Sequence, residues 1–479
     1  MGLVFILLLL VAPVAKASSW HVYESDNFRI VADKKRKDAK TQLHDLELFR
    51  QAAVLFTGLT QEAEKQRLTI VILEKSRNYL KVFSEKKAAG FYINSMFGPY
   101  MVVGPSDSAE NTAITLRHEY VHHLLHSSSS THYPRWYDEG ISDLLSTARV
   151  SANSVAIGAP HPWRRAQLGY GHVMGFSDLL VPANFFKDDY YGSLYYSTAW
   201  LAVHYFLLGE LNGVNLQGAN INRYLAGYAR GIRSHLDFEK LIGQDFATLN
   251  LALKQYAQRQ ELAGFRLPVQ PYRGGFSGSR LSDNQQRIEF GLVALAAGRW
   301  QVATEISSKI KKAEGAQLLR ALNTLAKAQL GDASLAAELN SHSEPDDPLA
   351  KILLAAAMLR EAQEQDNNAQ SLNKAERLAR EGLVAYPHNL YAREVLWRAA
   401  QIEEDLPAAT EQLLLAHQYF PANVWVNFLL GQVLLARGQL SEARLYLNNV
   451  VLWSHDRDMA MQAMALLQQI DADVKSEEP

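Results

Sequence analysis

The chain contains no cysteine among its 479 residues. This absence excludes disulfides, thiolate metal ligands, a cysteine nucleophile and a lipid-modified N-terminal cysteine. It does not assign a compartment, because exported proteins can lack cysteine as well. The chain also lacks an excess of positive charge, since 48 Lys and Arg residues stand against 50 Asp and Glu residues, a net charge of −2. We therefore expect no nucleic-acid partner.

Long apolar runs are absent except at the N-terminus, where LVFILLLLVAPVA covers residues 3–15. This run is shorter than the roughly 20 residues that cross a bilayer. Ala15 and Ala17 stand at the −3 and −1 positions of a signal-peptidase site. The pattern predicts a signal peptide over 1–17 and an exported protein, in the bacterial periplasm, with no transmembrane helix after cleavage. Secretion, or anchoring by an uncleaved N-terminal segment, is the alternative.

The rest of the chain divides into two parts of different character. Residues 18–266 mix strand-like alternation with helical periodicity, which predicts an α+β domain. A stretch rich in Gly, Pro and Ser at 267–284 predicts a linker. Residues 285–473 carry almost only helical patterns and predict an all-α domain. The expected strands lie at 20–25, 28–32, 67–73, 89–94 and 99–104, and a helix is expected over 38–57.

The helical part contains a repeat. Ala375, Ala409 and Ala443 recur at intervals of 34 residues, and Pro387 and Pro421 are separated by the same interval. A period of 34 residues with small residues where helices cross is typical of tetratricopeptide repeats. A non-repetitive helical bundle is the alternative.

A cluster of histidines is the first candidate site. The stretch HEYVHH begins at His118 and places His122 four residues later, with Glu119 between them. The spacing of Asp107 and Glu110 predicts a capping box at the start of a surrounding helix. Residues four apart lie on one face of a helix about 6 Å from each other, so both imidazoles can face one metal ion. A chance cluster is the alternative, since the chain has 15 histidines.

A second group of acidic residues follows in PRWYDEGISDLL at 134–145. A catalytic metal site needs three protein ligands and one open position, and Glu139 is a candidate third ligand. Asp143 lies one helical turn later and can accept a hydrogen bond from a ligand histidine, which would fix its tautomer. His126 is an alternative third ligand, although helical drift turns it about 80° away from His118.

HEYVH followed by WYDEGISD resembles the gluzincin metallopeptidases, and in particular the peptidase MA-like bacterial domains that often carry tetratricopeptide repeats. The resemblance implies a zincin-like fold for the α+β domain. It also implies that His118, His122 and Glu139 bind Zn²⁺ and that Glu119 is the catalytic base. The gap before Glu139 is at the short end for this family, and Ser142 stands where alanine is common.

Two further features relate to substrate. Gluzincins often supply a Tyr or His that stabilises the developing oxyanion, and Tyr196, within the helical pattern of residues 190–208, best matches that position; a packing role is its alternative. His204 is expected to be a core or surface histidine. An edge strand within 89–104 would hold a peptide backbone by strand addition.

These patterns lead to two functional hypotheses. The first is an exported zinc metallopeptidase that hydrolyses peptide bonds in a peptide or protein substrate, with its tetratricopeptide-like domain recruiting substrate or a protein partner. The second is a tetratricopeptide adaptor, or envelope assembly factor, whose peptidase-like domain is weakly active or inactive.

Overall fold

The architecture is that of a computed structural model. It describes residues 19–59, 67–83, 89–128, 133–168, 172–181, 189–216, 219–229, 232, 234–341, 343–364, 369–421, 423–454 and 457–477. The predicted signal peptide lies outside these residues.

A six-stranded mixed sheet forms the centre of the N-terminal region, with the strand order β4-β5-β3-β2-β1-β9. Its strands are β1 (His21–Glu24), β2 (Phe28–Ala32), β3 (Leu68–Ile72), β4 (Gly90–Ser95), β5 (Gly98–Val103) and β9 (Ser277–Arg280). β2, β3 and β5 run parallel, while the pairings of β1 with β2 and β9 and of β4 with β5 are antiparallel. β4 lies at one edge of this sheet. Strands β1 to β5 occur where the alternation of apolar and polar residues predicts them, whereas β9 lies in the segment predicted as a linker.

Both faces of the sheet are covered, which explains why β2 and β3 are almost continuously apolar. Ile30 and Ile70 face a core that includes Phe49 of helix α1 (Ala39–Thr57). Val31 points to the opposite face, into a cluster that includes Phe290 of helix α11 (Asp283–Ala296). The helical C-terminal region therefore packs directly on the sheet.

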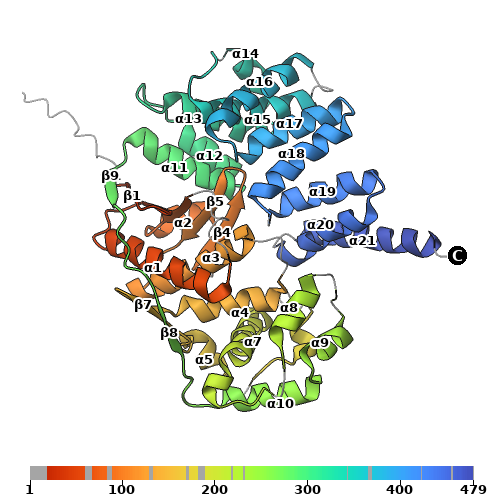
Figure 1. Cartoon of the computed structure of the whole chain (residues 1–479). Helices are drawn as coiled ribbons and strands as arrows, with labels where there is room; N and C mark the ends of the chain where they lie inside the picture. The colour runs from red at the N-terminus through yellow and green to blue at the C-terminus, as the bar shows by residue number, and fades with distance from the viewer. Residues whose placement is uncertain are drawn as a thin grey trace, which may run out of the picture.

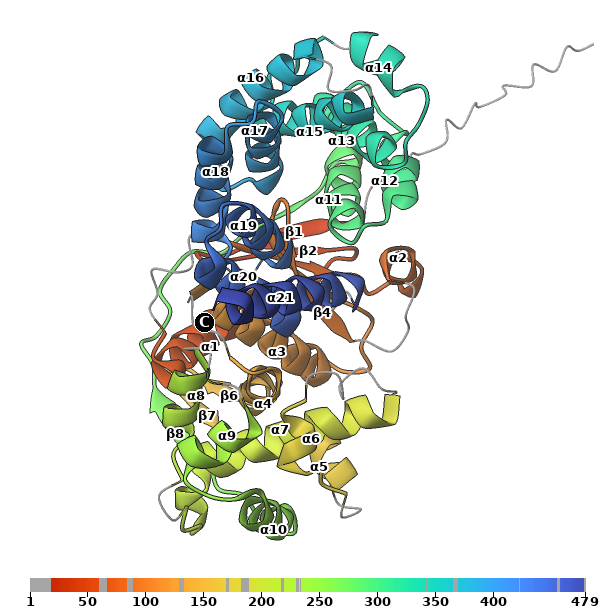
Figure 2. The same ribbon diagram turned by 90° about the vertical axis from the view of Figure 1, so that its right-hand side faces the viewer.

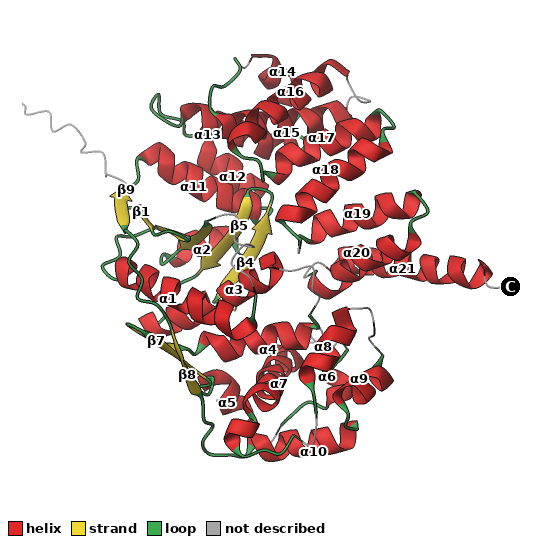
Figure 3. Ribbon diagram, viewed as in Figure 1, coloured by secondary structure: helices red, strands yellow, loops and turns green. Residues whose placement is uncertain are grey.

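Helices predominate in the rest of the N-terminal region (Figure 3). They are α2 (Ser76–Val82), α3 (Ala109–Ser128), α4 (Arg135–Ser146), α5 (Pro162–Leu168), α6 (Phe176–Leu179), α7 (Asp189–Leu208), the 3-10 helix η3 (Glu210–Asn212), α8 (Ile221–Ala229), α9 (His235–Ile242) and α10 (Phe246–Ala257). A small antiparallel sheet accompanies them, with β6 (Arg149–Ser151), β7 (Ser154–Ile157) and β8 (Phe265–Pro268). Helix α4 packs between α3 and α7.

Helix α3 begins one residue later than a cap at Asp107 would require. The hydroxyl of Ser108 accepts a hydrogen bond of 3.0 Å from the main-chain N–H of Asn111. The predicted capping box of Asp107 and Glu110 is therefore wrong by one position. A serine hydroxyl satisfies an orphan N–H as well as a carboxylate does, so spacing alone did not distinguish the two.

The C-terminal region is helical throughout its described residues. Its helices are α11 (Asp283–Ala296), α12 (Trp300–Ser307), α13 (Ala316–Gln329), α14 (Leu335–Ser341), α15 (Pro348–Glu364), α16 (Ala369–Ala385), α17 (Leu390–Ile402), α18 (Leu406–Tyr419), α19 (Val424–Ala436), α20 (Leu440–Trp453) and α21 (Arg457–Glu477). Ala375, Ala409 and Ala443 are all fully buried. The 34-residue spacing thus places one buried alanine on each of the helices α16, α18 and α20.

This helical region forms an arch that returns to the N-terminal region at both ends (Figures 1 and 2). Beyond the contact of α11 with the sheet, the main-chain N–H of Leu390 donates to the carbonyl of Met96, at the tip of the β4–β5 hairpin, over 3.0 Å. Farther along the chain, the guanidinium of Arg135 donates to the carbonyl of Leu452 over 3.2 Å.

The segment predicted as a linker, 267–284, contains the end of β8 and all of β9, so it contributes to both sheets. Among the described residues, none of the helices combines the length and hydropathy needed to cross a membrane.

Candidate metal centre

Two packed helices carry the predicted site. His118 and His122 lie one turn apart on α3, with their ring centroids 4.7 Å apart and their planes at 79°. Glu139 comes from the first half of α4, which packs against α3. The helical spacing in the sequence and the contact between the two helices therefore bring all three side chains together.

The three side chains converge on one point. Nε2 of His118 and Nε2 of His122 lie 3.1 Å apart. Oε2 of Glu139 lies 3.3 Å from the nitrogen of His122 and 3.6 Å from that of His118. These atoms form a group that could hold a metal ion.

The carboxylate of Glu139 is only 5% exposed, and its Oε2 has no hydrogen-bond partner within the described structure. Burial alone would raise the pKa of Glu139, but the two imidazoles outweigh this effect and lower it. Burial likewise opposes the charged form of His118, yet Asp143 and Glu139 raise its pKa to about 9. A buried anion requires positive charge nearby, and a cation between these atoms would satisfy all three.

Asp143 lies against the first imidazole, on the side away from Glu139. Its Oδ1 lies 3.0 Å from Nδ1 of His118, which leaves Nε2 of that ring directed toward Glu139. Asp143 is fully buried, and the Nε–H of Arg164 donates to its Oδ2 over 2.6 Å. Arg164 therefore keeps this carboxylate ionised and fixed in place.

Asp138 contacts the second imidazole in the same way. This contact was not predicted from the sequence. Oδ1 of Asp138 lies 2.9 Å from Nδ1 of His122, and its Oδ2 lies 2.6 Å from Nε2 of His126. These residues form a second group of potential metal ligands, which shares His122 with the first. Two features of the sequence could have indicated this contact. They are the position of Asp138 next to Glu139 at the start of α4 and the presence of His126 on α3.

Glu119 lies beside the cluster and lines the same cavity. Burial raises the pKa of its carboxyl group, and the neighbouring His118 and His122, together with a main-chain hydrogen bond from Tyr92, oppose that shift. Gly90 on β4 leaves space here, because a Cβ at that position would lie 2.6 Å from the Thr115 methyl group and 3.6 Å from Cγ of Glu119.

Gly140, which follows Glu139, sets the position of α4. A Cβ at Gly140 would lie 2.4 Å from the carbonyl oxygen of Ala199 and 2.6 Å from a methyl group of Val203, both on α7. Only glycine permits this close approach. Glu139 thus stands on a helix held firmly between α3 and α7.

Tyr196 and His204, the other two residues considered from the sequence, have different surroundings. Tyr196 lines the cavity, and the guanidinium of Arg164 lies 4.6 Å from the centre of its ring. His204 is a buried core histidine, with ring nitrogens 2.8 Å from the Tyr256 hydroxyl and 3.2 Å from the Gly158 carbonyl.

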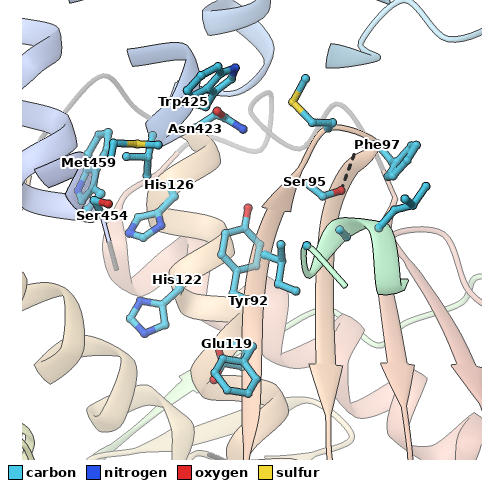
Figure 4. Close-up of a pocket in the computed structure, with 18 of the residues that line it drawn as sticks. Tyr92, Ser95, Phe97, Glu119, His122, His126, Asn423, Trp425, Ser454 and Met459 are labelled. Atoms are coloured by element: carbon cyan, nitrogen blue, oxygen red, sulfur yellow. Dashed lines mark hydrogen bonds between the residues drawn. The ribbon is translucent and has the colours of Figure 1, made fainter. Parts of the chain in front are cut away.

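The cavity above the cluster has a volume of about 900 Å³ and is bounded by both regions of the chain. Figure 4 shows His122 and Glu119 on its lower side, Tyr92 beside them, and Trp425 and Met459 of the helical region above. Substrate recruitment by the helical region was expected from the sequence, but its direct contribution to this cavity was not.

No protein-family model matches the chain, and a search of curated proteins found no match.

Proposed function

We propose that the chain is a zinc metallopeptidase of the gluzincin type, with a zincin-like N-terminal domain and a tetratricopeptide-like C-terminal domain. The observation that carries this proposal is the convergence of His118, His122 and Glu139, whose buried Oε2 has no other partner. Under this proposal the protein is exported, as the N-terminal pattern predicts.

The donor set fits zinc. Two imidazoles and one carboxylate, with a fourth position open, form a typical catalytic zinc site. Tetrahedral coordination with bonds of 2.0–2.2 Å would require ligand atoms about 3.3–3.6 Å apart. The three separations in the cluster, 3.1, 3.3 and 3.6 Å, lie close to that range.

Hydrogen bonds to Nδ1, on the side of each ring away from the cluster, orient His118 and His122 as ligands. Asp143 and Asp138 hold a proton on Nδ1 of His118 and His122, so each ring presents the lone pair of its Nε2 to the cluster. Because both carboxylates are buried within α4, the two rings have little freedom to rotate.

The reaction is hydrolysis of a peptide bond. Zinc, when bound, lowers the pKa of water and polarises the scissile carbonyl. The carboxylate of Glu119 accepts a proton from the attacking water as the new C–O bond forms, and passes it to the amine nitrogen as the C–N bond breaks. Tyr196 lines the same cavity, and its hydroxyl is our candidate donor to the oxygen that gains negative charge.

The test compares the wild type with Glu119→Gln on a peptide mixture prepared from a whole proteome, with zinc content measured for both. The proposal requires zinc in both proteins and cleavage by the wild type alone. The alternative, an adaptor with an inactive peptidase-like domain, requires that the two proteins behave alike on every peptide.

A further inference from the structure

The helical region turns one face toward the candidate metal centre. Alternate helices, from α11 to α21, each contribute one residue to this inner face, which we define as Leu295, Gln329, Arg360, Glu394, Trp425 and Met459. Arg360 and Glu394 stand 34 residues apart and form an ion pair of 2.8 Å. The repeat period therefore places equivalent positions of neighbouring helices side by side along the cavity.

The inner face is held at a fixed distance from the cluster. The hairpin tip at Met96 hydrogen-bonds to Leu390 on one side, and Arg135 at the start of α4 donates to Leu452 on the other. The ring of Trp453 lies 5.7 Å from that of His126. This face therefore belongs to the catalytic cavity and is not a separate surface that binds partners at a distance.

The edge strand β4 forms the adjacent wall. Its residues Gly90, Tyr92 and Ser95 line the cavity, and within the described residues no strand pairs with its outer edge. Apart from the main-chain N–H of Tyr92, which donates to Glu119, this unpaired edge offers main-chain N–H and C=O groups with which an extended chain segment can pair. A segment paired with β4 would run between that strand and the inner face.

The side chains of the inner face indicate which kind of polypeptide segment can bind next to β4. Trp425 and Met459 project toward the side of the cavity where Tyr92 and His126 lie (Figure 4). Both are half-buried and apolar, so they favour a large apolar side chain on the bound segment. A volume of about 900 Å³ holds a short extended segment but no folded domain.

We propose that the inner face of the helical region is the second wall of the substrate cleft, and that it selects unfolded polypeptide segments carrying a large apolar side chain near the bond to be cut. This inference rests on the proposed peptidase function, because it takes the segment over Glu119 as the substrate.

A binding experiment tests the inference without depending on catalysis. The full-length Glu119→Gln protein is titrated with a small disulfide protein that has been reduced and alkylated, and with the same protein in its folded state. We expect binding of the unfolded form alone. Adding Trp425→Ala should weaken that binding on the order of tenfold or more, as does the loss of an aromatic anchor at an interface. Met459→Ala should weaken it as well.

Tyr386→Ala is the matched control, because Tyr386 is an exposed aromatic residue of the helical region outside the cavity. Trp425→Phe should recover most of the binding, which separates a lost contact from a folding defect. The inference is overturned if the folded and unfolded forms bind equally, or if Trp425→Ala and Met459→Ala both bind like Tyr386→Ala. A wild type without zinc or cleavage contradicts the peptidase proposal instead, whatever the binding result.

Discussion

The carboxylate of Asp143 lies 3.0 Å from Nδ1 of His118 and at the same time accepts a 2.6 Å hydrogen bond from Arg164. One buried side chain therefore joins a partly buried arginine to the ring that faces the cavity. The orientation of the first candidate ligand depends on this link.

Replacing Asp143 by Asn should weaken zinc binding by about 10- to 100-fold, because the loss of a carboxylate behind a ligand histidine has effects of this size. Titration of the metal-free protein with zinc against a competing chelator measures the change. Asp346→Asn is the control, since Asp346 is exposed and lies outside the cavity. Equal affinities in the two variants would show that Asp143 does not position His118.

The two overlapping ligand groups make opposite predictions for a pair of variants. If the ion lies between His118, His122 and Glu139, then Glu139→Ala should lose zinc, whereas His126→Ala should keep it with somewhat lower affinity. The reason is that His126 reaches the first group only through Asp138. Zinc content after dialysis distinguishes them, and loss of zinc in His126→Ala alone would assign the ion to the second group.

Gly140→Ala should destabilise the protein by about 1–3 kcal/mol, the usual cost of overpacking a core. The added methyl group would lie 2.4 Å from the carbonyl oxygen of Ala199, so α4 or α7 must shift. Urea unfolding measures the free energy of unfolding. Gly275→Ala is the matched control, because a Cβ there meets no atom within 4 Å. A stability equal to that of the control would mean that α4 has more room than its contacts indicate.

The stability of the protein should depend on the protonation of His417. Burial lowers the pKa of this histidine to about 4 in the folded state, from an ordinary value near 6.5. The unfolded chain therefore binds a proton that the folded chain does not, and stability is lost as the pH falls from about 6.5 toward 4, by up to about 1.4 kcal/mol per pH unit. The free energy of unfolding of His417→Gln should fall less steeply over this range. Parallel pH profiles would contradict the assignment.

The pairing of His118 with His122 was predictable, because two residues four apart on a helix must lie on one face. Glu139 and Asp143 were predictable for the same reason within their own helix. The contact of Asp138 with both His122 and His126 was not, since it depends on the register in which α3 packs against α4. That register is set partly by Gly140, whose close neighbour on α7 lies almost sixty residues away.

Strands β1 to β5 of the central sheet and the helical character of the C-terminal region were also predictable from local patterns, whereas β9, with the sequence SGSR, was not. Periodicity gave the spacing of the buried alanines but not the curvature of the arch. The place of Trp425 beside the cavity results from the summed rotation of many helix pairs, together with the contact of Leu390 with Met96. Such contacts join residues hundreds of positions apart, and no short stretch of sequence encodes them.

The proposed peptidase activity requires that His118, His122 and Glu139 hold zinc. Elemental analysis of the purified full-length protein, expressed with added zinc and dialysed against metal-free buffer, tests it most directly. We predict about one zinc ion per chain in the wild type, as in a mononuclear catalytic site, and almost none in Glu139→Ala. A folded wild type that retains no zinc, or a Glu139→Ala variant that retains as much as the wild type, would contradict the claim.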